Sequence, residues 1–168
     1  SYILTQPATD SNKARVSFLL SDEWSYTDTL KAKQFLEQGR AFANGNRYLL
    51  ALYDFYTAQL LFETDKPQAE KMYLRSDSLL SAFKTKEAYY FRARAWHNYG
   101  AIHQLDNDSK TMLAVLIDKT IPLSIQSGDK NYLAQNYSDV GMIFMNQWQY
   151  DKAASYYDKA ISILEQAP

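Results

Sequence analysis

One stretch near the C-terminal end, from Gln135 to Gln166, constrains the fold of this chain more than any other. Its first half repeats apolar and small residues three or four positions apart, and its second half does so again after a short polar break. The positions are Tyr137, Val140, Gly141 and Phe144, then Ala153, Tyr157 and Ala160. Such spacing places side chains on one face of an α-helix. The stretch therefore predicts two α-helices packed as a hairpin, with small residues where they approach.

This spacing resembles the tetratricopeptide repeat, in which a helix with the pattern W-x2-L-G-x2-Y is followed by a second helix with A-x3-F. Here tyrosine, valine and phenylalanine stand at three of the pattern's large positions in the first helix. Each repeat of this kind buries its apolar face only by stacking on its neighbours. The resemblance implies an all-α fold, a right-handed superhelix of helix pairs.

Three earlier segments carry weaker copies of the pattern. The matching positions are Trp96, Tyr99, Gly100 and His103, with Leu113, Ile117 and Thr120; Tyr53, Tyr56, Thr57 and Leu60, with Ala69, Tyr73 and Ser76; and Val16, Leu19, Leu20 and Glu23, with Ala32, Leu36 and Gly39. The copies are spaced irregularly and more widely than the typical repeat of about 34 residues. We expect four repeats near residues 10–45, 46–84, 86–127 and 129–167, in one domain spanning 1–168. The alternative is an unrelated bundle of eight helices.

Capping and turn residues predict where the helices begin and end. Short polar side chains accept hydrogen bonds from free N–H groups at a helix start, and glycine closes a helix in the left-handed conformation. The expected signals are Asp10 or Ser11 and Asp28 at starts, Asn44-Gly45 at an end, Pro67 in a first turn, and Gly128-Asp129 at a junction. Pro122 lies inside a predicted helix, so we expect a kink near Asp118. The segment 47–63 is apolar on most sides, which predicts neighbours on more than one face.

Composition excludes several classes of function. The net charge is −1, which provides no basic surface for nucleic acid, and no run of residues is apolar enough to predict a membrane span. The chain has no cysteine, which excludes disulfides and thiolate chemistry but fits either the periplasm or the cytoplasm. The family resemblance favours the periplasm, because some arrays of this type are exported.

The sequence holds no catalytic motif of a hydrolase, kinase or dinucleotide-binding enzyme. Its two histidines, His97 and His103, are six positions apart, and on a helix that offset turns them away from one common ligand. Packing or surface roles explain both. We therefore predict no enzyme activity, no metal and no cofactor.

The resemblance implies a binding groove lined by the first helix of each pair. The groove residues it implies are Asp54, Leu61, Arg94, His97, Asn98, Gln104, Gln135, Ser138, Met142 and Met145. Arg94, His97 and Asn98 suit peptide carbonyls or a carboxylate, because all three can donate hydrogen bonds. Met142 and Met145 suit apolar side chains.

We therefore expect a protein or peptide interaction module. The long repeats and the Gly128-Asp129 junction resemble those of bacterial signalling proteins, which implies the sensor or scaffold region of a two-component kinase or a transcriptional regulator. The alternatives are a receptor for a small ligand or signal peptide, and a structural oligomerisation module. Ile161 and Leu164 broaden the apolar stripe of the last helix, so we also expect either further helices in a longer protein or a homodimer through the C-terminal helix.

Overall fold

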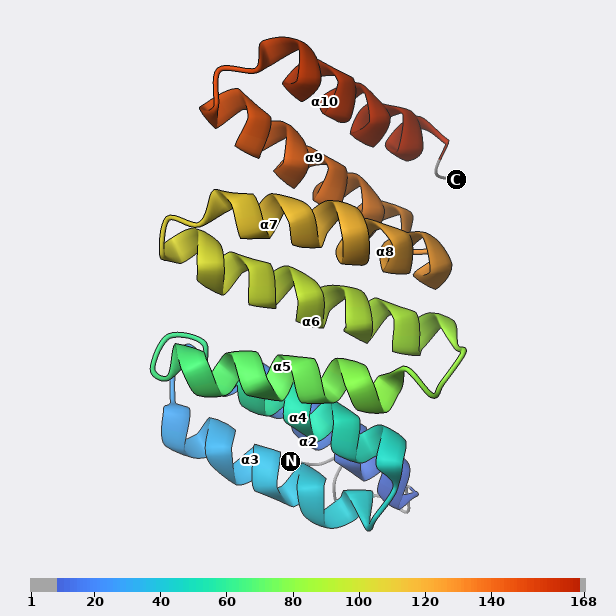
Figure 1. Cartoon of the computed structure of the whole chain (residues 1–168). Coiled ribbons are helices and arrows are strands. Elements are labelled where there is room, and N and C mark those ends of the chain that lie inside the picture. Colours follow the sequence, from blue (N-terminus) through green and yellow to red (C-terminus); the bar gives the residue numbers. More distant parts are fainter. Residues whose placement is uncertain (1–8, 167–168) are drawn as a thin grey trace. The chain divides into compact units, whose positions relative to one another are not determined.

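A computed structural model of the chain describes residues 9–166. Throughout those residues the chain is helical, with no strand, and consecutive helices pack as pairs (Figure 1). This confirms the expected all-α fold of paired helices. The chain divides into two compact units, residues 1–82 and 83–168, each of which is described by itself. Residue 167, the last of the expected fourth repeat, lies outside the described residues.

The N-terminal unit consists of two helix pairs. They are α2 (Asp10–Trp24) with α3 (Thr29–Ala43), and α4 (Arg47–Leu61) with α5 (Lys66–Leu80). α4 also contacts α2 and α3, so it has neighbours on several sides, as its apolar sequence predicts. Phe18 from α2 stacks on Tyr56 of α4, with 5.6 Å between ring centroids. Phe55 on the same helix meets Tyr73 of α5 edge-on at 5.8 Å. Aromatic rings thus pack both between the two pairs and within the second pair.

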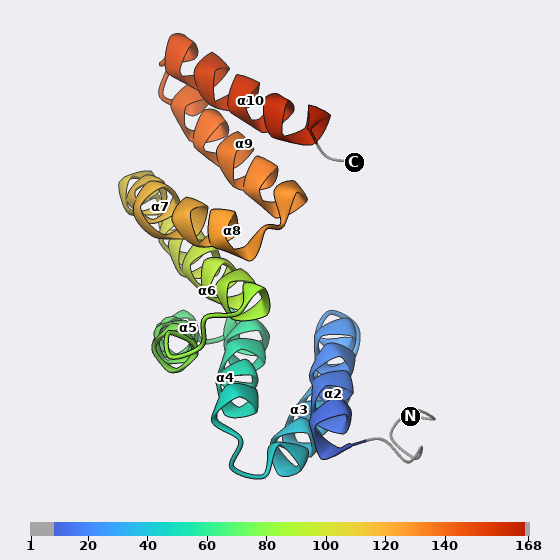
Figure 2. The ribbon, with the colours of Figure 1, turned by 90° about the vertical axis from the view of Figure 1, so that its right-hand side faces the viewer.

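The C-terminal unit contains the other two pairs. The elements are α6 (Lys86–Leu105), α7 (Ser109–Val115), the π-helical turn η1 (Leu116–Thr120), α8 (Ile121–Ser127), α9 (Lys130–Asn146) and α10 (Tyr150–Glu165). α7, η1 and α8 run on from one another and together pack against α6, while α9 and α10 form the second pair (Figure 2). Its core is a cluster of Met112, Leu116, Ile121, Val140, Ile143, Phe144 and Ala153.

Most of the predicted helix ends are confirmed. Asp28 and Asp129 accept backbone N–H groups in the first turns of α3 and α9. Asn44 and Gly128 close α3 and α8 in the left-handed conformation. The prediction for the first helix was wrong, because Thr9 caps α2 through its hydroxyl oxygen, 3.3 Å from the Asn12 nitrogen. Asp10 is already helical there, and its negative charge suits the positive end of the helix dipole.

Around Asp118, where Pro122 predicts a kink, the backbone forms the π turn η1. Proline has no N–H, so the carbonyl one helical turn before it loses its usual donor. The chain widens into a π turn instead, in which the Ile121 N–H bonds to the Leu116 oxygen, five residues back. π turns of this kind occur mostly as single insertions in α-helices. Leu116 and Thr120 are both fully buried within the turn.

Two glycines mark close helix contacts, as the repeat pattern predicts. A Cβ atom added at Gly141 of α9 would lie 2.8 Å from the Tyr157 ring of α10. One added at Gly100 of α6 would lie 2.6 Å from the Met112 sulfur of α7. Both distances are shorter than real Cβ contacts, so a side chain added at Gly141 would displace the Tyr157 ring, and one added at Gly100 would displace the flexible Met112 side chain.

Candidate functional site

Two neighbouring helices of the C-terminal unit, α6 and α9, share a surface of aromatic and charged side chains. We call it the α6–α9 face and define it as Tyr90, Arg94 and His97 of α6 with Tyr132 and Asp139 of α9. His97 Nε2 lies 2.9 Å from Asp139 Oδ2, and both side chains are about one-fifth exposed. The Tyr90 and Tyr132 rings meet edge-on at 5.5 Å. These contacts join the two helix pairs of the unit through side chains.

Arg94 completes the α6–α9 face. Its guanidinium lies over the Tyr90 ring, 5.7 Å from the centroid, and the His97 ring is tilted against Tyr132 at 6.2 Å. Burial raises the pKa of Tyr132 far above its ordinary value, although the nearby Arg94 opposes that shift. Tyr132 therefore stays protonated at physiological pH and keeps its hydroxyl as a hydrogen-bond donor.

Local sequence positions both helices of this face. Thr85 caps α6 through its hydroxyl oxygen, 3.1 Å from the Ala88 nitrogen. Asp129 caps α9 with its carboxylate 2.9 Å from the Tyr132 nitrogen. Beneath them, a buried hydrogen bond 2.9 Å long runs from Asn136 Nδ2 to Ser124 Oγ and ties α9 to α8. The face is thus supported by capped helices and a fixed interior.

The other predicted groove residues of the C-terminal unit spread along α6 and α9. Asn98 and Gln104 are half-buried on α6, and Ser138 is half-buried on α9. Gln135, Met142 and Met145 are exposed on α9. Three members of the face, Tyr90, Tyr132 and Asp139, were missed by sequence reasoning. Asp139 directly follows the predicted Ser138, and pairing it with His97 requires knowing how α9 packs beside α6.

The predicted residues of the N-terminal unit, Asp54 and Leu61, lie on α4. Leu61 is half-buried. Asp54 is only 2% exposed, and its Oδ2 atom lies 3.0 Å from the Arg75 Nε atom of α5 without a well-directed hydrogen bond. Burial raises the pKa of Asp54, and the charges of Arg75 and Arg40 partly oppose that shift.

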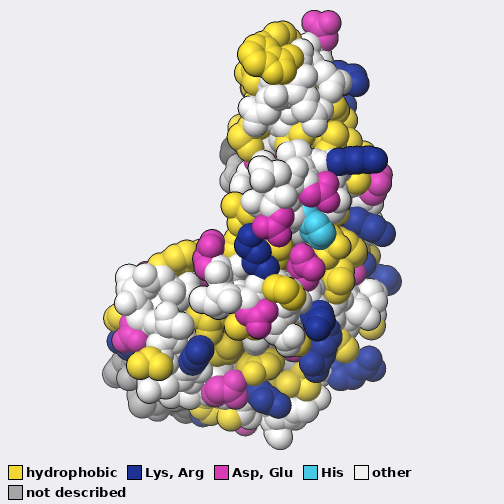
Figure 3. All heavy atoms as spheres, turned by 60° about the vertical axis from the view of Figure 1, so that its left-hand side comes forward, with side chains coloured by type: hydrophobic (Ala, Val, Ile, Leu, Met, Phe, Trp, Pro, Cys, Tyr) yellow, Lys and Arg dark blue, Asp and Glu magenta, His cyan; other side chains and the backbone are white. Residues whose placement is uncertain are grey.

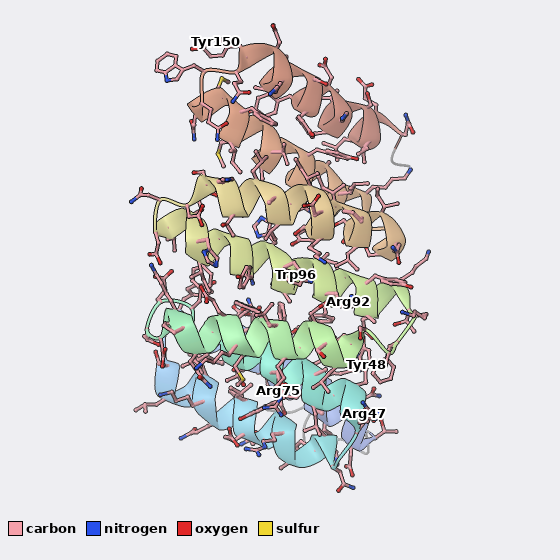
Figure 4. The ribbon with its side chains drawn as sticks, viewed as in Figure 1. Arg47, Tyr48, Arg75, Arg92, Trp96 and Tyr150 are labelled. Atoms are coloured by element: carbon pink, nitrogen blue, oxygen red, sulfur yellow. The ribbon has the colours of Figure 1, made fainter. Side chains whose placement is uncertain are left out.

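Asp54 also lies against a pocket of about 400 Å³, which we call the α4 pocket. Its lining comes from α3, α4 and α5 and consists of Arg40, Leu50, Tyr53, Asp54, Thr57, Gln68, Met72 and Arg75. Arg75 extends from α5 toward α3 in Figure 4. At one side of the pocket the Tyr53 hydroxyl donates a hydrogen bond to Glu37 Oε1 at 2.8 Å. Burial raises the pKa of Tyr53, and the hydrogen bond to Glu37 raises it further.

Replacing Asp54 with asparagine should make the protein more stable at neutral pH. The folded-state pKa of Asp54 is raised above its ordinary value of 3.8, so the carboxyl contributes its full stabilisation of the fold only below pH 3.8. That stabilisation is lost as the pH rises through the folded-state pKa. Asn has the same shape and no charge to desolvate, while the half-exposed Arg75 stays solvated. We expect Asp54→Asn to gain about 1 kcal/mol at pH 7.

Urea unfolding at several pH values checks this. The gain should grow as the pH rises from about 3 to 7. The exposed Asp118→Asn, on η1, is the matched control and should follow the wild-type pH curve. An Asp54→Asn variant that loses stability at pH 7 would show that the ion pair with Arg75 outweighs the cost of burying the carboxylate.

The turn between α9 and α10 carries a third cluster of exposed residues. Trp148 is 79% exposed, with a positive φ of 61°, and its ring meets Tyr150 edge-on at 6.2 Å. Tyr150 stands at the start of α10 in Figure 4.

Along α10, Ile161 and Leu164 are about half exposed, and only Ala153 and Ala160 are buried. On the face of the molecule that Figure 3 shows, acidic, basic and hydrophobic side chains lie interspersed.

Within residues 9–166, no three His, Cys, Asp or Glu side chains converge as a metal site, and no helix is long and apolar enough to cross a membrane. His97 and His103 bind separate carboxylates, since His103 Nδ1 lies 3.6 Å from Asp108 Oδ2. No protein-family model matches the chain, and no curated protein matches it either.

Proposed function

We propose that this chain is a protein- or peptide-binding module of the tetratricopeptide type, and that it binds through the α6–α9 face. The observation that carries the proposal is the set of side-chain contacts across that face, above all the 2.9 Å contact of His97 with Asp139. Consecutive helix pairs support the repeat assignment. The right-handed superhelix and the role in bacterial signalling rest on the family resemblance alone and stay predictions.

The chemistry of the face suits a polypeptide partner. Tyrosine and arginine are the residues that most often dominate binding energy at protein interfaces, because they combine a large apolar area with hydrogen bonding. Tyr90 and Arg94 stack on one another, and His97 is held by Asp139, so their side chains are ordered before a partner arrives. Ordering in advance lowers the entropy cost of association.

Substitution of Arg94 and His97 together should weaken peptide binding at least about tenfold, which equals roughly 1.4 kcal/mol. The probes are peptides selected from a random linear-peptide phage library on the immobilised full chain. Calorimetry then compares the wild-type protein with an Arg94→Gln, His97→Gln variant. Glutamine removes the guanidinium charge of Arg94 and the imidazole ring of His97 while keeping a side chain that can form hydrogen bonds.

The matched control is an Arg47→Gln, His103→Gln variant. Arg47 lies at the start of α4 (Figure 4), and His103 faces Asp108 at the end of α6, so both are outside the α6–α9 face. The control should bind the selected peptides as the wild-type protein does. Equal affinity of the Arg94, His97 variant and the wild-type protein would remove this face from the proposal, and so would a selection that enriches no peptide.

A further inference from the structure

The α4 pocket in the N-terminal unit shares no residue with the α6–α9 face. Its lining comes mostly from α4, which carries the buried Asp54, and from α5, with Arg40 contributed by α3. A volume of about 400 Å³ is within the range of pockets that hold small molecules, roughly 300–1,000 Å³. The pocket therefore has room for a small ligand, and its charges indicate which kind.

Arg75 is the best-placed group in this pocket to bind a ligand. Its Nε atom lies 3.0 Å from the carboxylate of Asp54, which is 2% exposed and holds that side of the guanidinium in place. The Arg75 side chain is nevertheless 62% exposed. A guanidinium has five N–H donors in a planar fork, so the two terminal nitrogens remain available to an incoming acceptor. The buried carboxylate thus orients a cation that solvent can still reach.

The cationic side chains of the lining favour an anionic ligand. Two guanidiniums, Arg40 and Arg75, face one carboxylate, Asp54. Glu37 is outside the lining and interacts with the Tyr53 hydroxyl and, at 3.7 Å, with Arg40. Glu37 partly offsets the charge of Arg40, so Arg75, which is 62% exposed, is the cation that attracts an anionic ligand.

The neutral lining residues complete the description of the ligand. Gln68 offers an amide donor beside the guanidiniums. Leu50 and Met72 add apolar surface, and methionine adapts its shape to an apolar group. From these observations we propose that the α4 pocket binds a small monocarboxylic acid. Its carboxylate pairs with the terminal nitrogens of Arg75, and its apolar body lies on Leu50 and Met72.

The test uses 4-methylpentanoate as the probe, with the full chain labelled at its methionine methyl groups. The Met72 signal, identified by its loss in Met72→Leu, should shift and saturate as the probe is added. A ligand of this size is expected to bind with a dissociation constant of roughly 1–10 mM. The uncharged 4-methylpentanamide and inorganic phosphate should leave the signal unmoved over the same range.

The decisive variant is Arg75→Gln, which removes the charge and keeps an amide. It should weaken binding of 4-methylpentanoate at least about tenfold. Arg47→Gln removes a charge of the same kind at the start of α4 and should leave binding unchanged. Circular dichroism, and the Met72 methyl signal recorded without the probe, report whether the N-terminal unit of each variant is folded.

Three results would overturn the proposal. The first is no saturable shift of the Met72 signal by about 50 mM probe. The second is equal binding of the amide or of phosphate, because the amide lacks the negative charge and phosphate lacks the apolar body that the pocket is proposed to recognise. The third is unchanged binding by a folded Arg75→Gln variant. None of these results bears on peptide binding by the α6–α9 face, which is tested with different probes in the other unit.

Discussion

Phe18→Ala should lower the free energy of unfolding of the N-terminal unit by about 3–5 kcal/mol. The Phe18 side chain is fully buried where three helices meet. Its ring stacks on Tyr56 of α4 and fills the space that Gly39 of α3 leaves open, since a Cβ atom there would lie 2.4 Å from the ring. Alanine would leave a cavity at the point where α2, α3 and α4 are joined.

Urea unfolding gives the overall loss, and hydrogen exchange followed by mass spectrometry shows which helices lose protection. We expect the largest losses in α2, α3 and α4. Leu19→Ala is the control, because it changes the next residue of the same helix and its side chain is 58% exposed. It should cost within about 0.5 kcal/mol. Similar losses for both variants would contradict the packing described for Phe18.

The second large effect is expected for Leu116→Ala, at about 2–5 kcal/mol. Leu116 is fully buried in the core of the C-terminal unit and begins the π turn η1. η1 contacts both α6 and α9, the two helices of the α6–α9 face. The variant should therefore be less stable and should also bind selected peptides more weakly, because the support beneath the face is loosened.

Ile117→Ala is the control for this variant. It changes the next residue of the same turn, and its side chain is 38% exposed. The control should lose little stability and keep its peptide affinity. Thermal unfolding and calorimetry measure the two properties separately. A Leu116→Ala variant with unchanged stability would mean that the core tolerates the cavity by closing around it, and the predicted link between η1 and the face would then fail.

Local signals made most of the helical organisation predictable. Asp28, Asp129 and Gly128 act within one turn of their own position, so their caps follow from the sequence directly. Gly100 and Gly141 likewise mark close approach of consecutive helices. Even where a local signal was assigned to the wrong residue, at Thr9 rather than Asp10 or Ser11, the start of the helix was displaced by only a residue or two.

The candidate sites depend on contacts between residues far apart in the chain. His97 meets Asp139 from a helix 42 residues later, and sequence reasoning named only the first of them. Asp54 was expected in a groove, but its burial and its partner Arg75 follow from how α5 packs on α4. No periodicity in a single helix reveals which side chain of a neighbouring helix it will face.

The sequence by itself determined the helices, their ends and their pairing, because capping, glycine contacts and apolar spacing act over a few residues. The tertiary structure alone decided which polar groups come together. It placed Tyr132 and Asp139 beside α6, and it put Arg75 over a buried carboxylate at the edge of a pocket. The physical reason is that the energies of charge and ring contacts depend on distances across helix pairs, and packing sets those distances.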